Sequence, residues 1–250
     1  MEIFNIVFKC NLCNGGKNSS KDWGFNGICS KDLIEYNIKT LNRSSCSHKD
    51  TLCRKYYNNE ISYDELLEKF KETYVCYESR MLDKWVARAG WDTNNRIKPR
   101  KILNTAINKL AVLTLVTPKS QESERKIFAD FLIDEYYKGD GVNEEGYVSC
   151  TSEYKLYFNR EEANKMKFWN FYENQGSDEC KWGSGLFRYL DDEQAAQILK
   201  CAYEVKKGTE DEKLSYDFLQ HYCMIHNIDM NNISEPSGAN IKKETGFIKI

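Results

Sequence analysis

The residues with the clearest capacity for chemistry are cysteines near the start of the chain. Six of the ten cysteines lie in the first 76 residues: Cys10, Cys13, Cys29, Cys46, Cys53 and Cys76. Cys10 and Cys13 form a C-x2-C pair followed by Gly15 and Gly16, and two thiolates on one tight turn suit a tetrahedral zinc site. We therefore expect a structural zinc ion held by four of Cys10, Cys13, Cys29, Cys46 and Cys53.

Two other interpretations of these cysteines stay open. The second pair, Cys46 and Cys53, has a wider spacing than usual, although His48 between them is a substitute ligand. The thiols can instead be reduced core side chains, or a redox C-x2-C, which lacks the surrounding βαβ pattern of a thioredoxin-like motif. A closed site with four thiolates would be a structural staple and would leave the function to be found elsewhere.

A basic segment with interleaved tryptophans follows the cysteine-rich region. From Arg80 to Lys126 the chain has eleven Lys and Arg against four Asp and Glu, a net charge of +7, although the whole chain carries −2. Lys and Arg neutralise phosphates and indole rings stack on unpaired bases, so this composition favours nucleic acid. The alternative is an ordinary solvated surface with tryptophans in the core. The predicted nucleic-acid-binding residues are Trp85, Arg88, Trp91, Arg96, Lys98, Arg100 and Lys101.

Aromatic residues concentrate a second time between residues 168 and 189. Seven rings in 22 residues, with Gly183 and Gly185 between them, predict a pocket that holds a flat ligand such as a base, unless the rings pack helices onto a sheet. The predicted base-pocket residues are Trp169, Asn170, Trp182, Ser184 and Arg188.

One pattern is compatible with catalysis. Glu153 and Lys155 form E-x-K on a predicted strand after Asp140, which resembles the PD-(D/E)xK nucleases. That resemblance implies that Asp140 and Glu153 hold Mg²⁺ and that Lys155 supports the attacking water. The residue before Asp140 is Gly139 where that motif has proline, so we expect a binding protein rather than an enzyme.

Composition and hydropathy indicate a globular protein. The chain of 250 residues is 41% hydrophobic with three prolines, and its apolar runs are far shorter than the roughly 20 residues of a membrane span. The first residues lack the basic region and cleavage pattern of a secretory signal. We expect a cytoplasmic protein with no membrane partner.

The predicted elements place these residues in three parts. Residues 1–78 are expected to form an irregular cysteine-rich cap with a helix at 63–72, and residues 79–232 a β core under a helical layer, beginning with a helix at 79–89. Strands are predicted at 111–116, 127–134 and 147–158, followed by helices, and residues 233–250 read as a loosely ordered tail. The predicted fold class is α+β: a zinc-stapled cap followed by a small barrel-like β core covered by helices.

Between a basic segment and an aromatic-bearing helical layer, the chain has the segments LAVLTLV, TPKSQESER, IFADFLID and YVSCTSEYKLYF. This order of segments resembles the PUA-like superfamily of EVE, ASCH, YTH and SRA domains. The resemblance covers residues 95–190, and it implies an aromatic pocket for a modified or flipped base in DNA or RNA. It also implies a restriction or defence context in bacteria, with an effector protein as an additional partner. The sequence thus predicts a nucleic-acid-binding module, with a Mg²⁺-dependent nuclease and a protein-interaction domain as alternatives.

Overall fold

The computed structural model describes residues 2–72, 75–92, 98–175 and 177–246. Within these ranges the strands form two sheets beside groups of helices, and they form no closed barrel. The α+β class is therefore confirmed, whereas the barrel-like core is not seen. No helix among the described residues has both the length and the apolar character needed to cross a membrane.

The larger sheet has five strands in the order β7-β4-β3-β1-β8. Its strands are β1 Asn5–Lys9, β3 Leu110–Leu115, β4 Lys126–Leu132, β7 Lys155–Tyr157 and β8 Phe187–Leu190. β1 and β3 run parallel, and every other neighbouring pair is antiparallel. β3 is buried along its whole length, which explains why its sequence is apolar except for Thr114, without polar alternation.

The smaller sheet has three antiparallel strands in the order β2-β6-β5. They are β2 Val86–Arg88, β5 Glu135–Tyr137 and β6 Tyr147–Ser149. The prediction of a helix at 79–89 is wrong beyond its first residues. α5 spans only Met81–Lys84, and the chain then enters β2. The helix ends at Trp85 in the left-handed conformation (φ 45°), which redirects the backbone into the strand.

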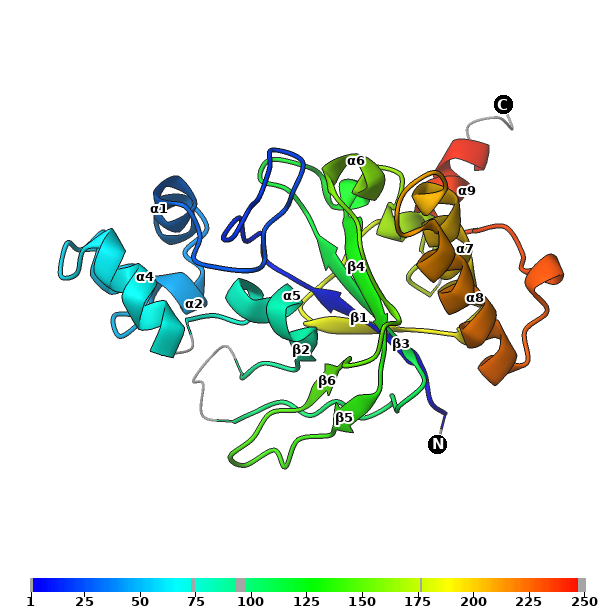
Figure 1. Cartoon of the computed structure of the whole chain (residues 1–250), viewed down its shortest axis with the longest axis horizontal. Coiled ribbons are helices and arrows are strands. Elements are labelled where there is room, and N and C mark those ends of the chain that lie inside the picture. Colours follow the sequence, from blue (N-terminus) through cyan, green and yellow to red (C-terminus); the bar gives the residue numbers. More distant parts are fainter. Residues whose placement is uncertain (1, 73–74, 93–97, 176, 247–250) are drawn as a thin grey trace.

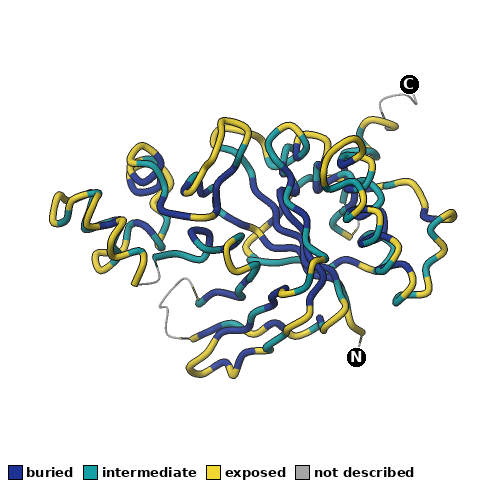
Figure 2. Tube along the Cα trace, in the orientation of Figure 1, coloured by how far each residue is buried: buried dark blue, intermediate teal, exposed yellow. Residues whose placement is uncertain are grey.

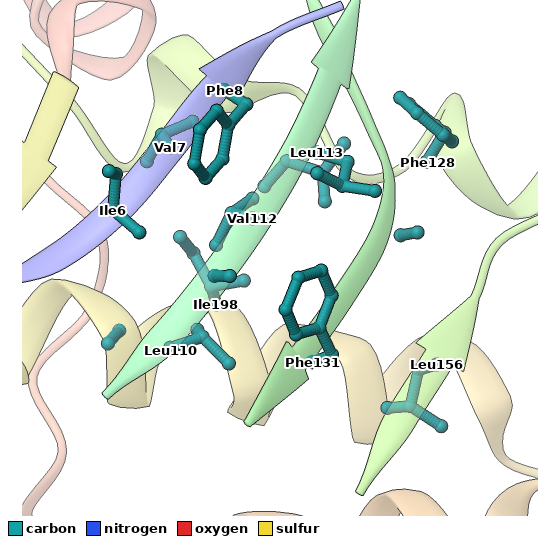
Figure 3. Close-up of a cluster of buried hydrophobic side chains, with 14 of the residues drawn as sticks. Ile6, Val7, Phe8, Leu110, Val112, Leu113, Phe128, Phe131, Leu156 and Ile198 are labelled. Atoms are coloured by element: carbon teal, nitrogen blue, oxygen red, sulfur yellow. The ribbon is translucent and has the colours of Figure 1, made fainter. Parts of the chain in front are cut away.

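Helices surround the large sheet on two sides (Figure 1). The helices on the C-terminal side are α6 Arg160–Ala163, α7 Asp192–Lys206, α8 Glu212–His226 and α9 Ala239–Gly246. α7 lies against the sheet, with Ile198 near Leu110 and Val112 in Figure 3. The core is therefore an apolar layer between the sheet and α7, and it appears as the continuous buried centre of Figure 2.

A small helical lobe projects from the other side, and we call residues 28–72 the cap. Its helices are α1 Lys31–Lys39, α2 Ser44–Ser47, α3 Leu52–Tyr57 and α4 Tyr63–Glu72. The helix predicted at 63–72 is confirmed, with Ser62 and Glu65 exchanging hydrogen bonds at its start. The expectation of irregular structure outside residues 63–72 is wrong for this region, which is mainly helical.

The structure also changes two predicted boundaries. β1 lies in the middle of the large sheet, so residues 1–78 do not form a unit separate from the β core. The tail expected to be loose contains α9 and the buried residues Ile233 and Ala239, while residues 247–250 lie outside the described ranges.

Candidate functional site

A cavity of about 510 Å³ lies where the cap meets the large sheet. That volume is within the range of about 300–1,000 Å³ that small-molecule sites occupy. Its walls come from the end of β1, from α2 and the residue before α3, from the segment that leads into α5, and from the chain after β2 (Figure 1). The lining residues are Phe8, Lys9, Cys10, Asn11, Ser44, Ser45, Thr51, Val75, Cys76, Tyr77, Glu78, Met81, Arg88, Gly90, Trp91, Asp92 and Leu186.

The position of the cavity follows from the local backbone. β1 ends at Lys9, the Cys10 N–H still donates to Thr114 O of β3 at 2.8 Å, and the strand end from Phe8 to Asn11 lines the cavity. Asn11 donates its backbone N–H to Glu78 Oε1 at 3.0 Å, which joins this strand end to the segment before α5. Gly90 adopts a positive φ of 74° and packs so closely on Leu186 that an added Cβ would lie 2.7 Å from a methyl group. Any residue with a Cβ would be strained there by the positive φ.

The polar groups of the cavity include charges of both signs. Glu78 is only 8% exposed, so its carboxylate faces the cavity from a largely buried position. Lys9 supplies an ammonium group, and partial burial together with the guanidinium of Arg125 lowers its pKa. Tyr77 donates its hydroxyl to Glu145 Oε1 at 2.7 Å, and Arg88 lies 4.0 Å from that same oxygen. The cavity thus presents a fixed acceptor, two cations and three aromatic rings, those of Phe8, Tyr77 and Trp91.

The basic segment continues from this cavity into a second hollow. Trp91 pairs with Pro99 across an isolated β-bridge, and Asp92 donates its backbone N–H to Lys98 O at 3.0 Å. The returning chain, residues 98–101, which we call the basic limb, lines this second hollow together with Asp92, Leu103, Gly141 and Phe187. Because Asp92 lines both hollows, the cavity and the basic limb are adjacent on the molecule.

The predicted nucleic-acid-binding residues are divided by this geometry. The structure brings Arg88 and Trp91 to the cavity, and it places Lys98, Arg100 and Lys101 on the basic limb. Arg96 lies outside the described residues. Trp85 packs edge-on against Phe131 at 6.2 Å, lies under the Lys155 ammonium and is not a lining residue of the cavity.

The residues predicted to form a base pocket occupy a different place. Trp169 and Trp182 are 0% and 2% exposed, and both rings pack against Phe168. Their indole N–H groups donate to Glu122 Oε1 and Gly185 O, so both rings are fully engaged in packing and hydrogen bonding. Rings held in this way contribute to the core, as the alternative interpretation of this segment proposed.

The polar members of that group are also engaged or distant from the cavity. Asn170 accepts a hydrogen bond from Asn240, and the Arg188 guanidinium lies over the Trp182 ring at 5.5 Å. Ser184 is exposed on the turn before β8. None of the five predicted base-pocket residues lines the cavity.

The predicted nuclease residues do not come together. Asp140 lies in the loop before β6, where its carboxylate accepts the backbone N–H groups of Val142, Asn143 and Glu144. Glu153 and Lys155 follow the other end of β6. The Asp140 carboxylate therefore stabilises its own loop, and this loop lies at the opposite end of β6 from Glu153 and Lys155.

The predicted zinc ligands are close together only in pairs. Within the described ranges, no three Cys, His, Asp or Glu side chains stand in an arrangement that holds a metal ion. Cys13 and Cys29 are in contact, and so are Cys46 and Cys53, whereas Cys10 contacts Met81 instead. A zinc-stapled cap therefore stays a prediction.

The cavity itself was missed at the sequence level. Its signal was the grouping of Tyr77, Glu78, Arg88 and Trp91 within 15 residues, but the decisive strand end, Phe8 to Asn11, lies far away in the sequence. Comparison of the chain with protein-family models, with curated proteins and with solved structures finds no match. The function must therefore be argued from the cavity and its surroundings.

Proposed function

We propose that this chain is a nucleic-acid-binding module that holds phosphates on the basic limb and one unpaired base in the cavity. The observation that carries the proposal is the adjacency of the two hollows through Asp92, because a nucleotide presents a flat ring and an anion a short distance apart.

The chemistry of the cavity suits a base. The indole of Trp91 and the phenol ring of Tyr77 offer stacking surfaces, and stacking on aromatic side chains stabilises unpaired bases by about 1–3 kcal/mol each. The Glu78 carboxylate is an acceptor for the amino or imino protons on the edge of a base. Apolar side chains such as Phe8, Met81 and Leu186 complete the wall and suit a base that carries a methyl group. This supports the predicted recognition of a modified base, although the cavity lies elsewhere than predicted.

The basic limb supplies the other half of the interaction. Lys98 is exposed, and Lys101 lies against Gly141 on the same hollow. Each phosphate that these cations neutralise releases counterions, so the affinity must fall with salt.

Binding should be titrated with labelled single- and double-stranded RNA and DNA, with and without 5-methylcytosine or 5-hydroxymethylcytosine, at two or more salt concentrations. Trp91→Ala should weaken binding of the preferred ligand about 10-fold or more without changing the salt slope. The triple variant Lys98→Ser, Arg100→Ser, Lys101→Ser should reduce the salt slope by about 0.7–0.9 for each phosphate that the variant no longer neutralises.

A matched control removes three cations from the helical side: Lys165→Ser, Lys207→Ser, Lys213→Ser. These lysines are exposed, so this variant should bind like the parent. Absence of binding to every oligonucleotide, or equal effects of the two triple variants, would refute the proposal.

A further inference from the structure

Four cysteines form two thiol pairs at the junction of the cap and the core. Cys13 follows β1 and Cys29 precedes α1, and their Sγ atoms are 3.5 Å apart. Cys46 on α2 and Cys53 on α3 lie together in the buried apolar cluster of the cap. Three segments of the cap and one loop of the core thus contribute cysteine side chains to one region.

The two pairs also interact with each other. Cys46 and Cys53 belong to the buried apolar cluster of the cap, and Cys29 packs against that same cluster. Cys29, Cys46 and Cys53 therefore lie in one region rather than in two independent sites.

The backbone holds the first pair firmly. Asn14 and Ser30, the residues after Cys13 and Cys29, exchange hydrogen bonds of 2.9 and 2.8 Å. Gly15 packs on the backbone at Gly27 so closely that an added Cβ would lie 2.0 Å from a carbonyl oxygen. These contacts fix the Cys13 and Cys29 segments side by side whether or not an ion is bound.

Cys10 is excluded from the cluster by its own contacts. Its Sγ lies 3.7 Å from Met81 Sδ and 3.9 Å from Phe8 O, and it lines the cavity. The C-x2-C pair that the sequence suggests is therefore divided, because Cys10 ends the strand on the cavity side while Cys13 turns toward Cys29.

The cap has a physical need for a staple. Its buried apolar cluster contains only six residues, Ile28, Ile34, Ile38, Cys46, Cys53 and Leu66. A lobe with so small a core is marginal without a metal ion, a disulfide or a partner surface. Two of those six side chains are themselves thiols, so the sulfur lies at the point where stabilisation is needed.

The separation within the first pair agrees with tetrahedral metal coordination. Thiolates at about 2.3 Å from zinc are about 3.8 Å from each other in a tetrahedron, close to the spacing of Cys13 and Cys29. The four thiols do not converge on one point among the described residues, so binding requires the Cys46 and Cys53 pair to move toward the fixed pair.

We propose that Cys13, Cys29, Cys46 and Cys53 bind one zinc ion that joins the cap to the core. Ser44 and Ser45 precede Cys46, Thr51 lies two residues before Cys53, and all three line the cavity. The ion therefore fixes one wall of the cavity. This last consequence bears on the proposed function, but the metal site itself does not depend on it.

The first test uses the unmodified protein. Purified under reducing conditions, it should contain about one zinc per chain by elemental analysis. Replacement of zinc by Co²⁺ should give the thiolate-to-metal absorption band of a four-sulfur site. A protein free of metal that also fails to bind Zn²⁺ or Co²⁺, or a Cys13–Cys29 disulfide detected by a mass lower by two hydrogens, would overturn the proposal.

The second test assigns the ligands. Cys46→Ser and Cys53→Ser should weaken Co²⁺ binding more than 10-fold and change the absorption band, whereas Cys10→Ser and Cys180→Ser should retain one metal per chain. Loss of metal in Cys10→Ser with retention in Cys46→Ser would contradict the ligand set, and replacement of one ligand by Cys76 would show as a loss in Cys76→Ser. Because metal content needs no oligonucleotide, a failure here is separate from a failure of the proposed function.

Discussion

At the scale of single residues, two aspartates near the large sheet have opposite electrostatic surroundings. Asp130 on β4 is fully buried, and within the described structure neither carboxylate oxygen has a hydrogen-bond partner. Burial raises its pKa well above the usual value, and Lys206 opposes this only in part. Asp192 at the start of α7 is the contrary case: burial opposes its charge, but hydrogen bonds with His226, Lys109 and Asn5 hold its pKa well below the usual value.

Ionisation of Asp130 should therefore lower the free energy of unfolding as the pH rises. A carboxyl whose folded pKa is raised stabilises the fold fully below its unfolded pKa of about 3.9, and that contribution is lost as the pH rises toward the folded pKa. Asp130→Asn cannot ionise, so its stability relative to the parent should increase between pH 4 and pH 7, by about 1–3 kcal/mol. Urea unfolding at several pH values measures the difference.

Asp192→Asn is the matched control with the opposite sign. Its folded pKa is depressed, so its contribution is present above the unfolded pKa and is lost as the pH falls. The variant should be less stable than the parent at pH 7 and approach it in acid. Parallel pH profiles for both variants would contradict this account of the two sites.

At the scale of elements, α7 is stabilised by a capping box at its N-terminus. Asp191 Oδ1 accepts the Gln194 N–H at 2.7 Å, and Gln194 Oε1 accepts the Asp191 N–H at 3.1 Å. This capping box stabilises the first turn of the helix that covers the large sheet, so it contributes to the free energy of unfolding of the whole core.

Asp191→Ala should lower the free energy of unfolding by about 1 kcal/mol, because it leaves an N–H group at the helix start without its acceptor. Asp191→Asn keeps an acceptor and should stay close to the parent. Asp178→Ala, at an exposed position, should have little effect. Thermal and urea unfolding of the three variants provide the comparison. Equal free energies of unfolding for the Ala and Asn variants at position 191 would contradict a stabilising role of the capping box.

At the scale of the whole molecule, the N-terminal strand binds the two ends of the chain together. Asn5 on β1 is fully buried and accepts hydrogen bonds from the backbone of Leu110 and from the Tyr222 hydroxyl. It also donates to Asp192 Oδ1 at 2.9 Å. One side chain thus joins β1, β3, α7 and α8 into a single core.

A chain that begins at residue 79, the boundary expected from the sequence, should fail to fold. It would lack β1 and expose β3 and β8 to solvent as unpaired edges, which favours aggregation. Circular dichroism and size-exclusion chromatography would detect the failure.

The matched variant keeps β1 and replaces residues 31–72 by a Gly/Ser linker. Tyr63 on α4 donates its hydroxyl to Cys29 O at 3.0 Å, so the last helix of the cap contacts the segment before α1 and a linker can join the two ends. This variant should fold with native strand content. A folded 79–250 chain, or an unfolded cap-deleted variant, would show that the core is organised differently.

The sequence by itself determined the elements whose signals are local. The apolar runs at 111–116 and 127–134 predicted β3 and β4, the helix expected at 63–72 is α4, and helices were expected after the strands, where α7 and α8 lie. These signals succeed because burial pattern and capping are written within one turn or one strand. The charge of the segment 80–126 was equally readable, since it needs no partner.

Only the tertiary structure decided what depends on distant neighbours. β1 is five residues long, and its place between β3 and β8 comes from pairing across more than 100 residues of sequence. The same pairing separates Cys10 from Cys13 and opens the cavity at the strand end. The aromatic segment 168–189 reads alike whether its rings line a pocket or fill a core, and packing around Phe168 places Trp169 and Trp182 in the core. Composition records which side chains are present, whereas the free energy of burial depends on which surfaces meet them.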